Sequence, residues 1–208
     1  MQDMIAKCRL EVEGIYNQFD ASHDLDHIDR VMKNAEKILA TEPRADELVV
    51  RLAVLLHDVE DAKYEEMQKV TTMELLEKIG ATQQITDNVM SAIESVSFSG
   101  GNAKDITSIE GAIVRDADRL DAIGAVGIAR AFAFGGARGR KLYDQREEAR
   151  MDMSESEYRK KETATVTHFY EKLLLLKELM VTKEGTRLAK ERHDFMENFL
   201  HQLKIEID

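Results

Sequence analysis

Apolar and polar residues follow one another along most of the chain with the spacing of amphipathic helices. From about residue 25 to 40, apolar side chains recur every three or four positions, which places them on one helical face. From about residue 47 to 57 the chain is apolar on nearly every side, and this pattern predicts a central, fully buried helix. No segment shows the period-two alternation of a strand. The pattern therefore predicts an all-α helical bundle.

The same spacing predicts further helices, with turn residues between them. Pro43 follows the helix at 25–40, and Gly80 separates two later helices as a C-cap would. Polar loops at residues 97–105 and about 135–154 are the best candidates for segments that gate a substrate. No domain boundary stands out in the 208 residues, so we expect one compact domain over residues 1–208. The further helices are expected at about residues 3–16, 69–79, 84–96, 108–134, 155–181 and 186–205.

The composition narrows the possible ligands and the cellular compartment. The net charge is −11, which repels the phosphate backbone of DNA or RNA, so we expect no nucleic-acid partner. A small phosphorylated ligand needs local cations or a metal to offset this charge. Cys8 is the only cysteine, the N-terminus lacks the apolar core of a signal peptide, and the apolar stretches are too short to span a membrane. We therefore expect a cytoplasmic protein without a membrane partner.

The candidate functional residues lie where an apolar segment ends in a side chain whose burial costs free energy. His57 and Asp58 end an eight-residue run that is apolar except for Arg51. A carboxylate at the edge of a core needs a cation or strong hydrogen bonds. Taken alone, the pair is more often a polar helix end, with an exposed aspartate and a hydrogen-bonded core histidine.

Two other segments carry ligand-type side chains. Asp118 and Asp121 are three residues apart beside an apolar helical face, although Asp118 could instead pair with Arg115 on a solvated edge. His23 and His27 have the i,i+4 spacing of metal ligands, a spacing that also arises by chance, and His23 alone suits a solvent-exposed helix start. Together, imidazoles and carboxylates suit one divalent ion, chosen from Mn, Fe, Co, Ni, Mg and Zn.

The order of these motifs resembles the HD-domain phosphohydrolase superfamily, an all-α family. His27 stands in HIDRV, His57 and Asp58 in LLHDVED, and Asp118 in DADRLDA. Wider segments, such as VRDADRLDAIGAVGIAR, resemble a subfamily of small single-domain bacterial and archaeal proteins, whose relatives include a nucleoside triphosphate pyrophosphohydrolase of bacilli. The resemblance implies that His27, His57, Asp58 and Asp118 hold the metal in a core at about residues 20–135, with the helices at about 155–205 packed on it.

The resemblance also implies roles around the metal. Asp61 stands three residues after Asp58, where a carboxylate orients or activates the attacking water, so Asp61 and Asp58 are the expected catalytic residues. Asp61 could instead be an exposed loop acid or a partner of Lys63. No histidine lies between His57 and His168, which favours one metal unless His23 recruits a second.

Phosphate contacts must come from groups near the metal. For His168 and Lys172, which are four residues apart, a solvated helix face is an equal alternative, and Arg119 could instead balance the acidic stripe. The expected substrate-binding residues are Lys63, His23, Arg119, His168 and Lys172.

The resemblance implies hydrolysis of a small phosphorylated substrate, most closely attack on the α-phosphate of a nucleoside or deoxynucleoside triphosphate to give the monophosphate and pyrophosphate. Two alternatives stay open. One is a nucleotide monophosphatase or phosphodiesterase on the same scaffold, because pocket shape decides the substrate. The other is a non-catalytic ligand sensor that contains a metal. The protein is expected to be a monomer or a homodimer.

Overall fold

The computed structural model describes residues 1–19, 23–61, 70–96, 105–150 and 163–208 of the chain. These residues form α-helices and one 3-10 helix, with no strand among them, which confirms the all-α prediction. The chain divides into two compact units: unit 1 comprises Met1–Ser97 and Ala103–Asp118, and unit 2 comprises Phe98–Asn102 and Arg119–Asp208. The single domain expected over the whole chain stays a prediction.

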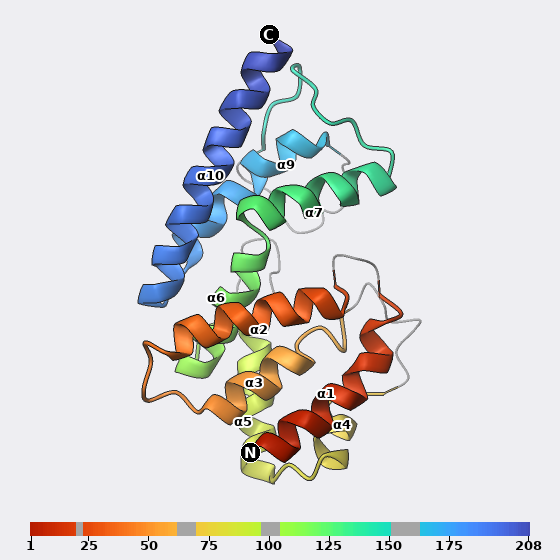
Figure 1. The fold of residues 1–208 in the computed structure, drawn as a ribbon, viewed down its shortest axis with the longest axis vertical. Helices are drawn as coiled ribbons and strands as arrows, with labels where there is room; N and C mark the ends of the chain where they lie inside the picture. Colours follow the sequence, from red (N-terminus) through yellow and green to blue (C-terminus); the bar gives the residue numbers. More distant parts are fainter. Residues whose placement is uncertain (20–22, 62–69, 97–104, 151–162) are drawn as a thin grey trace. The chain divides into compact units, whose positions relative to one another are not determined.

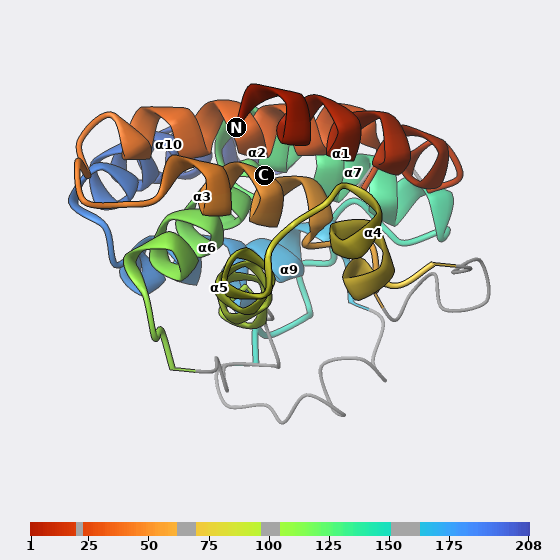
Figure 2. The ribbon, with the colours of Figure 1, turned by 90° about the horizontal axis from the view of Figure 1, so that it is seen from below.

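Unit 1 is organised around one buried helix. Helix α3 packs against α1, α2 and α5, and Figure 2 shows it between α5 and the layer formed by α1 and α2. The seven buried residues of α3 include every apolar residue from Val49 to Leu56, which confirms the predicted central helix. The helices of this unit are α1 (Gln2–Tyr16), α2 (Leu25–Leu39), α3 (Glu47–Leu56), α4 (Thr72–Lys78), α5 (Gln83–Glu94) and most of α6 (Ile109–Asp121) (Figure 1).

Buried hydrogen bonds tie the helices of unit 1 to one another. The hydroxyl of Tyr16 in α1 donates to the carbonyl of Leu55 in α3 at 2.9 Å. The side-chain amide of Asn34 in α2 donates to the carbonyl of Ala117 in α6 at 3.0 Å. Both side chains are buried. Because a buried donor without an acceptor is costly, each bond favours one placement of the two helices that it joins.

Unit 2 contains the end of α6 together with later helices. Helix α10 packs against α7 and the 3-10 helix η2, and α9 packs against both α7 and η2. The rings of Phe132, Phe169 and Phe199 form an aromatic cluster with centroids 5.8–6.2 Å apart. The elements of this unit are α7 (Gly124–Ala137), α9 (Thr165–Glu171), η2 (Leu173–Leu179) and α10 (Lys183–Ile207).

The prediction of one long helix at about 108–134 is wrong, because α6 ends at Asp121 and α7 begins at Gly124. Gly124 has a φ of 75°, in the left-handed region that glycine tolerates best. A Cβ atom on Gly124 would lie 3.0 Å from the Cβ of Arg192, and one on Gly127 would lie 2.2 Å from the carbonyl oxygen of Ala122. The two glycines therefore permit a close turn between helices whose apolar periodicity runs on without a gap.

The prediction of one helix at about 155–181 is also wrong within the described part. Helix α9 ends at Glu171, and Lys172 leaves the helical region with φ −141° and ψ −59°. The chain then continues as η2, in which the buried residues Leu173 and Leu176 are three apart. Side chains three apart eclipse in a 3-10 helix, so this geometry directs both leucines to one side. The first part of the predicted helix, up to residue 162, lies outside the described residues.

The other predicted helices are confirmed with small shifts at their ends. Helix α4 begins after Thr71, which forms a capping box with Glu74, and Gly80 ends it with a φ of 80°. Of the two expected gating loops, residues 97–104 and 151–154 lie outside the described residues, and residues 138–150 are not helical. In the described part of the chain no single helix is long and apolar enough to cross a membrane, although α6 and α7 pass that test when taken together.

Candidate metal centre

His27 is placed by the start of α2. Asp24 caps this helix, and its carboxylate accepts a hydrogen bond from the His27 backbone N–H at 2.9 Å. Such a cap satisfies one of the amide donors that a helix start leaves open. The side chain of His27 is 1% exposed. The cap thus fixes the backbone of a buried imidazole in the first turn of the helix.

His57 and Asp58 follow the last turn of α3. The Nδ1 atom of His57 lies 2.9 Å from the carbonyl oxygen of Val54. A carbonyl only accepts, so Nδ1 carries a proton and donates, and Nε2 is the nitrogen that offers a lone pair once it is deprotonated. A hydrogen bond of this kind on the far nitrogen is what orients a histidine that binds a metal.

Asp118 lies on α6, directly after the residue that Asn34 holds. Its Oδ1 is 3.6 Å from Nε2 of His27 and 3.8 Å from Nε2 of His57. The Asn34 bond to Ala117 therefore anchors the turn of α6 that presents this carboxylate.

The four side chains converge on one point in unit 1. Oδ2 of Asp58 is 3.3 Å from Nε2 of His27 and 3.5 Å from Nε2 of His57. The ligand atoms of His27, His57 and Asp118 all lie within 4.8 Å of one another. Two ligands about 2.1 Å from one ion, at angles between octahedral and tetrahedral, are about 3.0–3.4 Å apart. The observed spacing is slightly wider and fits a divalent ion. We call His27, His57, Asp58 and Asp118 the candidate metal centre.

Two buried atoms at this point have unused bonding capacity. Nε2 of His57 and Oδ2 of Asp58 make no hydrogen bond within the described part of the chain. A buried polar atom without a partner costs free energy, and a bound cation would remove that cost. Imidazole nitrogen and carboxylate oxygen are also the donors that borderline divalent ions prefer. The residues present therefore fit a metal.

Electrostatics couple the imidazoles to the carboxylates. Burial opposes a charge on His57, but the charges of Asp58 and Asp118 outweigh it and raise the pKa of His57 to about 9. Burial likewise opposes a charge on Asp58, but His57 and His27 hold the pKa of its carboxyl below the usual range. Without a metal, His57 and Asp58 are therefore held as an ion pair. A metal that binds there displaces a proton.

His23 and Asp61 stand next to the candidate metal centre. The rings of His23 and His27 have centroids 5.7 Å apart, which agrees with the expectation that the two histidines face one way. The backbone N–H of Asp61 donates to the carbonyl of Asp58 at 3.2 Å, in the turn that follows α3. The catalytic role of Asp61 and the substrate contact of His23 stay predictions.

The remaining residues expected to bind substrate are outside unit 1 or outside the described residues. Arg119, His168 and Lys172 belong to unit 2, and Lys63 lies outside the described residues. Arg119 is buried, and its guanidinium donates to the carbonyl of Leu179 at 2.6 Å. This bond ties Arg119 to the last residue of η2, and the substrate contacts of Arg119, His168, Lys172 and Lys63 stay predictions.

The residues that hold the ligands were not among the site residues predicted from the sequence. Asp24 caps the helix of His27, and Asn34 anchors the helix of Asp118. Tyr16 is fully buried close to Asp58, and burial, with a smaller contribution from that carboxylate, raises its pKa well above the usual value. The available signals were an Asp three residues before His27 and an amide on the buried face of α2.

Comparison with known proteins identifies the family. The HD domain matches residues 24–123, a span that holds the whole candidate metal centre. YpgQ of Bacillus subtilis is 39% identical over 204 residues, which are 96% of this chain and 91% of YpgQ. The chain belongs to the HD-domain family. The protein is therefore an HD-type metal-dependent phosphohydrolase, as the sequence resemblance predicted.

Solved structures of other proteins match nearly the whole chain. A Lactobacillus plantarum protein is 32% identical, with a TM-score of 0.85 over 99% of this chain and 97% of its own. Bacillus subtilis YpgQ in complex with ADP is 34% identical, with a TM-score of 0.78 over 98% and 94% of the two chains. An HD-superfamily hydrolase from Bacillus thuringiensis is 34% identical, with a TM-score of 0.76 over 99% and 97%.

Proposed function

We propose that this hydrolase converts a nucleoside or deoxynucleoside triphosphate to the monophosphate and pyrophosphate, with one divalent ion at the candidate metal centre. The observation that carries the substrate class is the structure of YpgQ in complex with ADP, since YpgQ is similar over nearly the full chain. The convergence of two imidazoles and two carboxylates in unit 1 supports the metal. The net charge of −11 favours a free nucleotide over DNA or RNA.

In this proposal each of the following residues of unit 1 has a separate role. His57 offers Nε2 because its Nδ1–H is engaged by the carbonyl of Val54, and Asp58 and Asp118 contribute oxygen ligands. Bound there, a divalent ion supplies Lewis-acid stabilisation of phosphoryl charge and lowers the pKa of water. Asp61 follows in the turn after Asp58, where its carboxylate would orient the attacking water and accept a proton.

The test is product release from a panel of nucleotides after the metal-free protein has been reloaded with Mn, Co, Ni, Mg or Zn. We expect pyrophosphate from triphosphates, and loss of both metal binding and turnover in Asp118→Ala. The matched control is Asp87→Ala, which removes an exposed carboxylate from α5 of the same unit.

Each other outcome has a defined meaning. Phosphate release from monophosphates alone would replace the proposed reaction with a nucleotidase. Silence with every metal would replace it with a ligand sensor. An Asp118→Ala protein that binds metal and turns over substrate normally would contradict the assignment of the metal centre.

A further inference from the structure

The loop that follows α7 carries basic residues that are held against α9 within unit 2. The backbone N–H of Arg140 donates to the carbonyl of Gly135 at 2.9 Å, and the N–H of Thr165 donates to the carbonyl of Lys141 at 2.9 Å. A Cβ atom on Gly135 would meet the Thr165 hydroxyl at 2.2 Å and lie 3.7 Å from the Cβ of Arg140. The loop therefore lies tightly beside the first turn of α9.

One aromatic ring orients two guanidinium groups. The Cζ atom of Arg138 lies 3.5 Å from the centroid of Phe134, and that of Arg140 lies 5.4 Å from the same centroid. Both distances are in the range of cation–π contacts, which attract a cation but do not neutralise it. The ring thus holds two positive groups near one another, and they repel.

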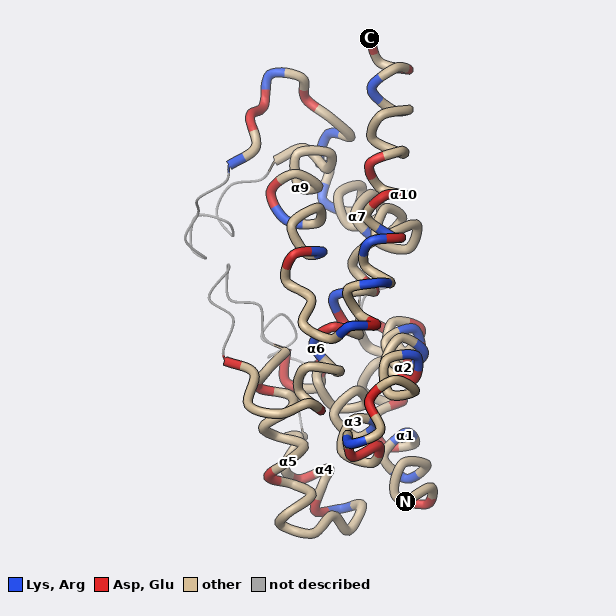
Figure 3. The backbone as a smooth tube through the Cα atoms, turned by 90° about the vertical axis from the view of Figure 1, so that its left-hand side faces the viewer, with Lys and Arg blue, Asp and Glu red and all other residues tan. Residues whose placement is uncertain are grey.

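Neither guanidinium forms an ion pair with any described residue. Nε of Arg140 is buried and makes no hydrogen bond in this part of the chain. Two acids of this unit are engaged elsewhere, since Asp144 accepts from Lys141 at 2.6 Å and Glu171 accepts from the guanidinium of Arg150 at 2.7 and 3.0 Å. Basic and acidic positions both occur along this loop (Figure 3), yet no acid among the described residues forms an ion pair with Arg140. A desolvated guanidinium nitrogen without an acceptor is costly.

Two further basic groups belong to this region, His168 in α9 and Lys172 directly after it, and the charges of Arg140 and Lys172 both act on His168. His168 is half-buried, and burial, together with the charges of Lys172 and Arg140, lowers its pKa to about 4. His168 is therefore a neutral imidazole near pH 7, and its ring N–H is a donor. We call Arg138, Arg140, His168 and Lys172 the basic cluster.

We propose that the basic cluster is a phosphate-binding site within unit 2 that takes the phosphate chain of a nucleoside polyphosphate. A guanidinium presents a planar fork of donors that matches phosphate oxygens, and Lys172 adds a point charge. A phosphate oxygen at Nε of Arg140 would also satisfy a buried donor that has no hydrogen bond among the described residues. The choice of a nucleotide as the ligand rests on the proposed function, whereas the preference for phosphate rests on the cluster itself.

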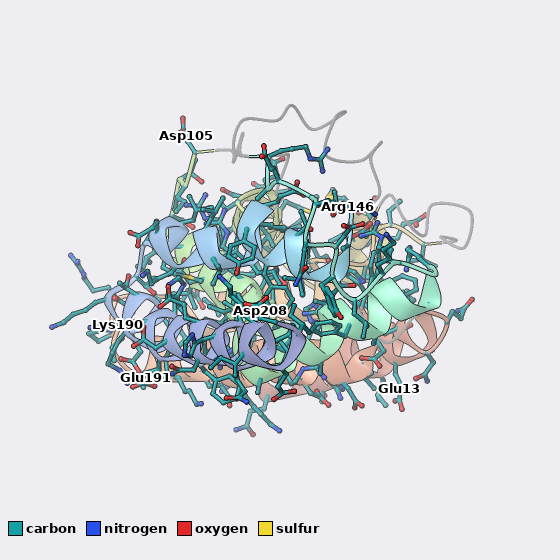
Figure 4. The ribbon with its side chains drawn as sticks, turned by 90° about the horizontal axis from the view of Figure 1, so that it is seen from above. Glu13, Asp105, Arg146, Lys190, Glu191 and Asp208 are labelled. Atoms are coloured by element: carbon teal, nitrogen blue, oxygen red, sulfur yellow. The ribbon has the colours of Figure 1, made fainter. Side chains whose placement is uncertain are left out.

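The test is calorimetric titration of the full-length protein with inorganic tripolyphosphate in buffer that contains EDTA. We expect Arg140→Gln and Arg138→Gln to weaken binding about tenfold, because each removes a charge-assisted contact. The matched control is Arg187→Gln on α10, which removes an equal charge at an exposed position. Arg187 pairs with Glu184 and Glu191, and Figure 4 shows Glu191 pointing outward from α10. The control should stay within about twofold of the wild type, because surface ion pairs contribute little.

The outcomes separate this site from the proposed function. No binding of tripolyphosphate by the wild type, or wild-type affinity in both Arg138→Gln and Arg140→Gln, would overturn the basic cluster. If Arg140→Gln fails to fold, the exposed Arg138→Gln decides the matter. Asp118→Ala should bind tripolyphosphate like the wild type while it loses hydrolysis. Wild-type protein that binds tripolyphosphate through Arg140 but hydrolyses no nucleotide would contradict the proposed function and support the basic cluster.

Discussion

The candidate metal centre in unit 1 is assembled from three helices, whereas the basic cluster in unit 2 lies on a loop and one short helix. In the first, opposite charges are buried together, and backbone bonds orient them. In the second, like charges gather around one ring, and the acids nearby pair with other residues. The ligands of a cation site can pair with one another before the cation binds. The positive groups of an anion site, in contrast, lack a counter-charge until the anion binds.

The largest expected effect is the loss of a ligand from the candidate metal centre. His57→Gln should lower hydrolysis by about a thousandfold or more, because a metal contributes several kcal/mol and each 1.4 kcal/mol is about tenfold. Metal binding by calorimetry and turnover of a triphosphate measure this effect. His201→Gln is the control, since His201 is an exposed histidine on α10. If His57→Gln binds the metal with unchanged affinity, His57 is not a ligand, and the contrast between a metal site in unit 1 and an anion site in unit 2 fails.

The next effect concerns a residue that holds a ligand without binding the metal. Asn34→Ala removes the buried bond to Ala117, directly before Asp118. We expect about tenfold weaker metal binding, as for outer-shell partners of metal ligands, and a free energy of unfolding lower by about 1–2 kcal/mol. Asn88→Ala, at an exposed position on α5, should change neither quantity. Wild-type metal affinity in Asn34→Ala would mean that α6 needs no anchor from α2.

A smaller effect tests the break between α6, which carries Asp118, and α7, which precedes the loop that carries Arg138 and Arg140. Gly124→Ala should lower the free energy of unfolding by about 1–2 kcal/mol, because φ is positive and the new Cβ would crowd Arg192. Gly136→Ala is the control, as no atom lies within 4 Å of its added Cβ, and stability should rise by less than about 1 kcal/mol. Denaturant unfolding measures both changes. Equal stability of Gly124→Ala and the wild type would show that the break tolerates an L-residue.

A separate effect of pH contrasts His57 with His168 in the metal-free protein. The pKa of His57 is raised to about 9, so its stabilisation is complete below its unfolded value near 6.5 and is lost as pH rises toward 9. The pKa of His168 is lowered to about 4, so stability falls as pH drops from about 6.5 toward 4. In EDTA, the free energy of unfolding should therefore be greatest near pH 6.5, as measured by urea titrations across pH. His57→Gln should flatten only the alkaline limb, and a profile unchanged by that substitution would contradict the assignment.

A site residue could be predicted from the sequence only where it interrupts a regular hydrophobic pattern or belongs to a recognisable motif. His57 and Asp58 could be singled out because they end an apolar run, and the order of motifs added Asp118. The break at Gly124 could not be seen, because the apolar period continues through it and the close contact with Arg192 comes from a distant helix. Arg140 was also missed, since its burial depends on the approach of Gly135 to Thr165.

The bond from His57 to the carbonyl of Val54 has a consequence for how this site tolerates mutation. Helix α3 ends at Leu56, so Val54 is among the last four residues, whose carbonyls have no partner within the helix. The acceptor that decides which nitrogen of His57 is protonated is therefore part of the main chain. Every amino acid supplies that carbonyl, so substitutions at Val54 can change packing but cannot remove the acceptor. The protonation of His57 at Nδ1 therefore does not depend on which amino acid occupies position 54.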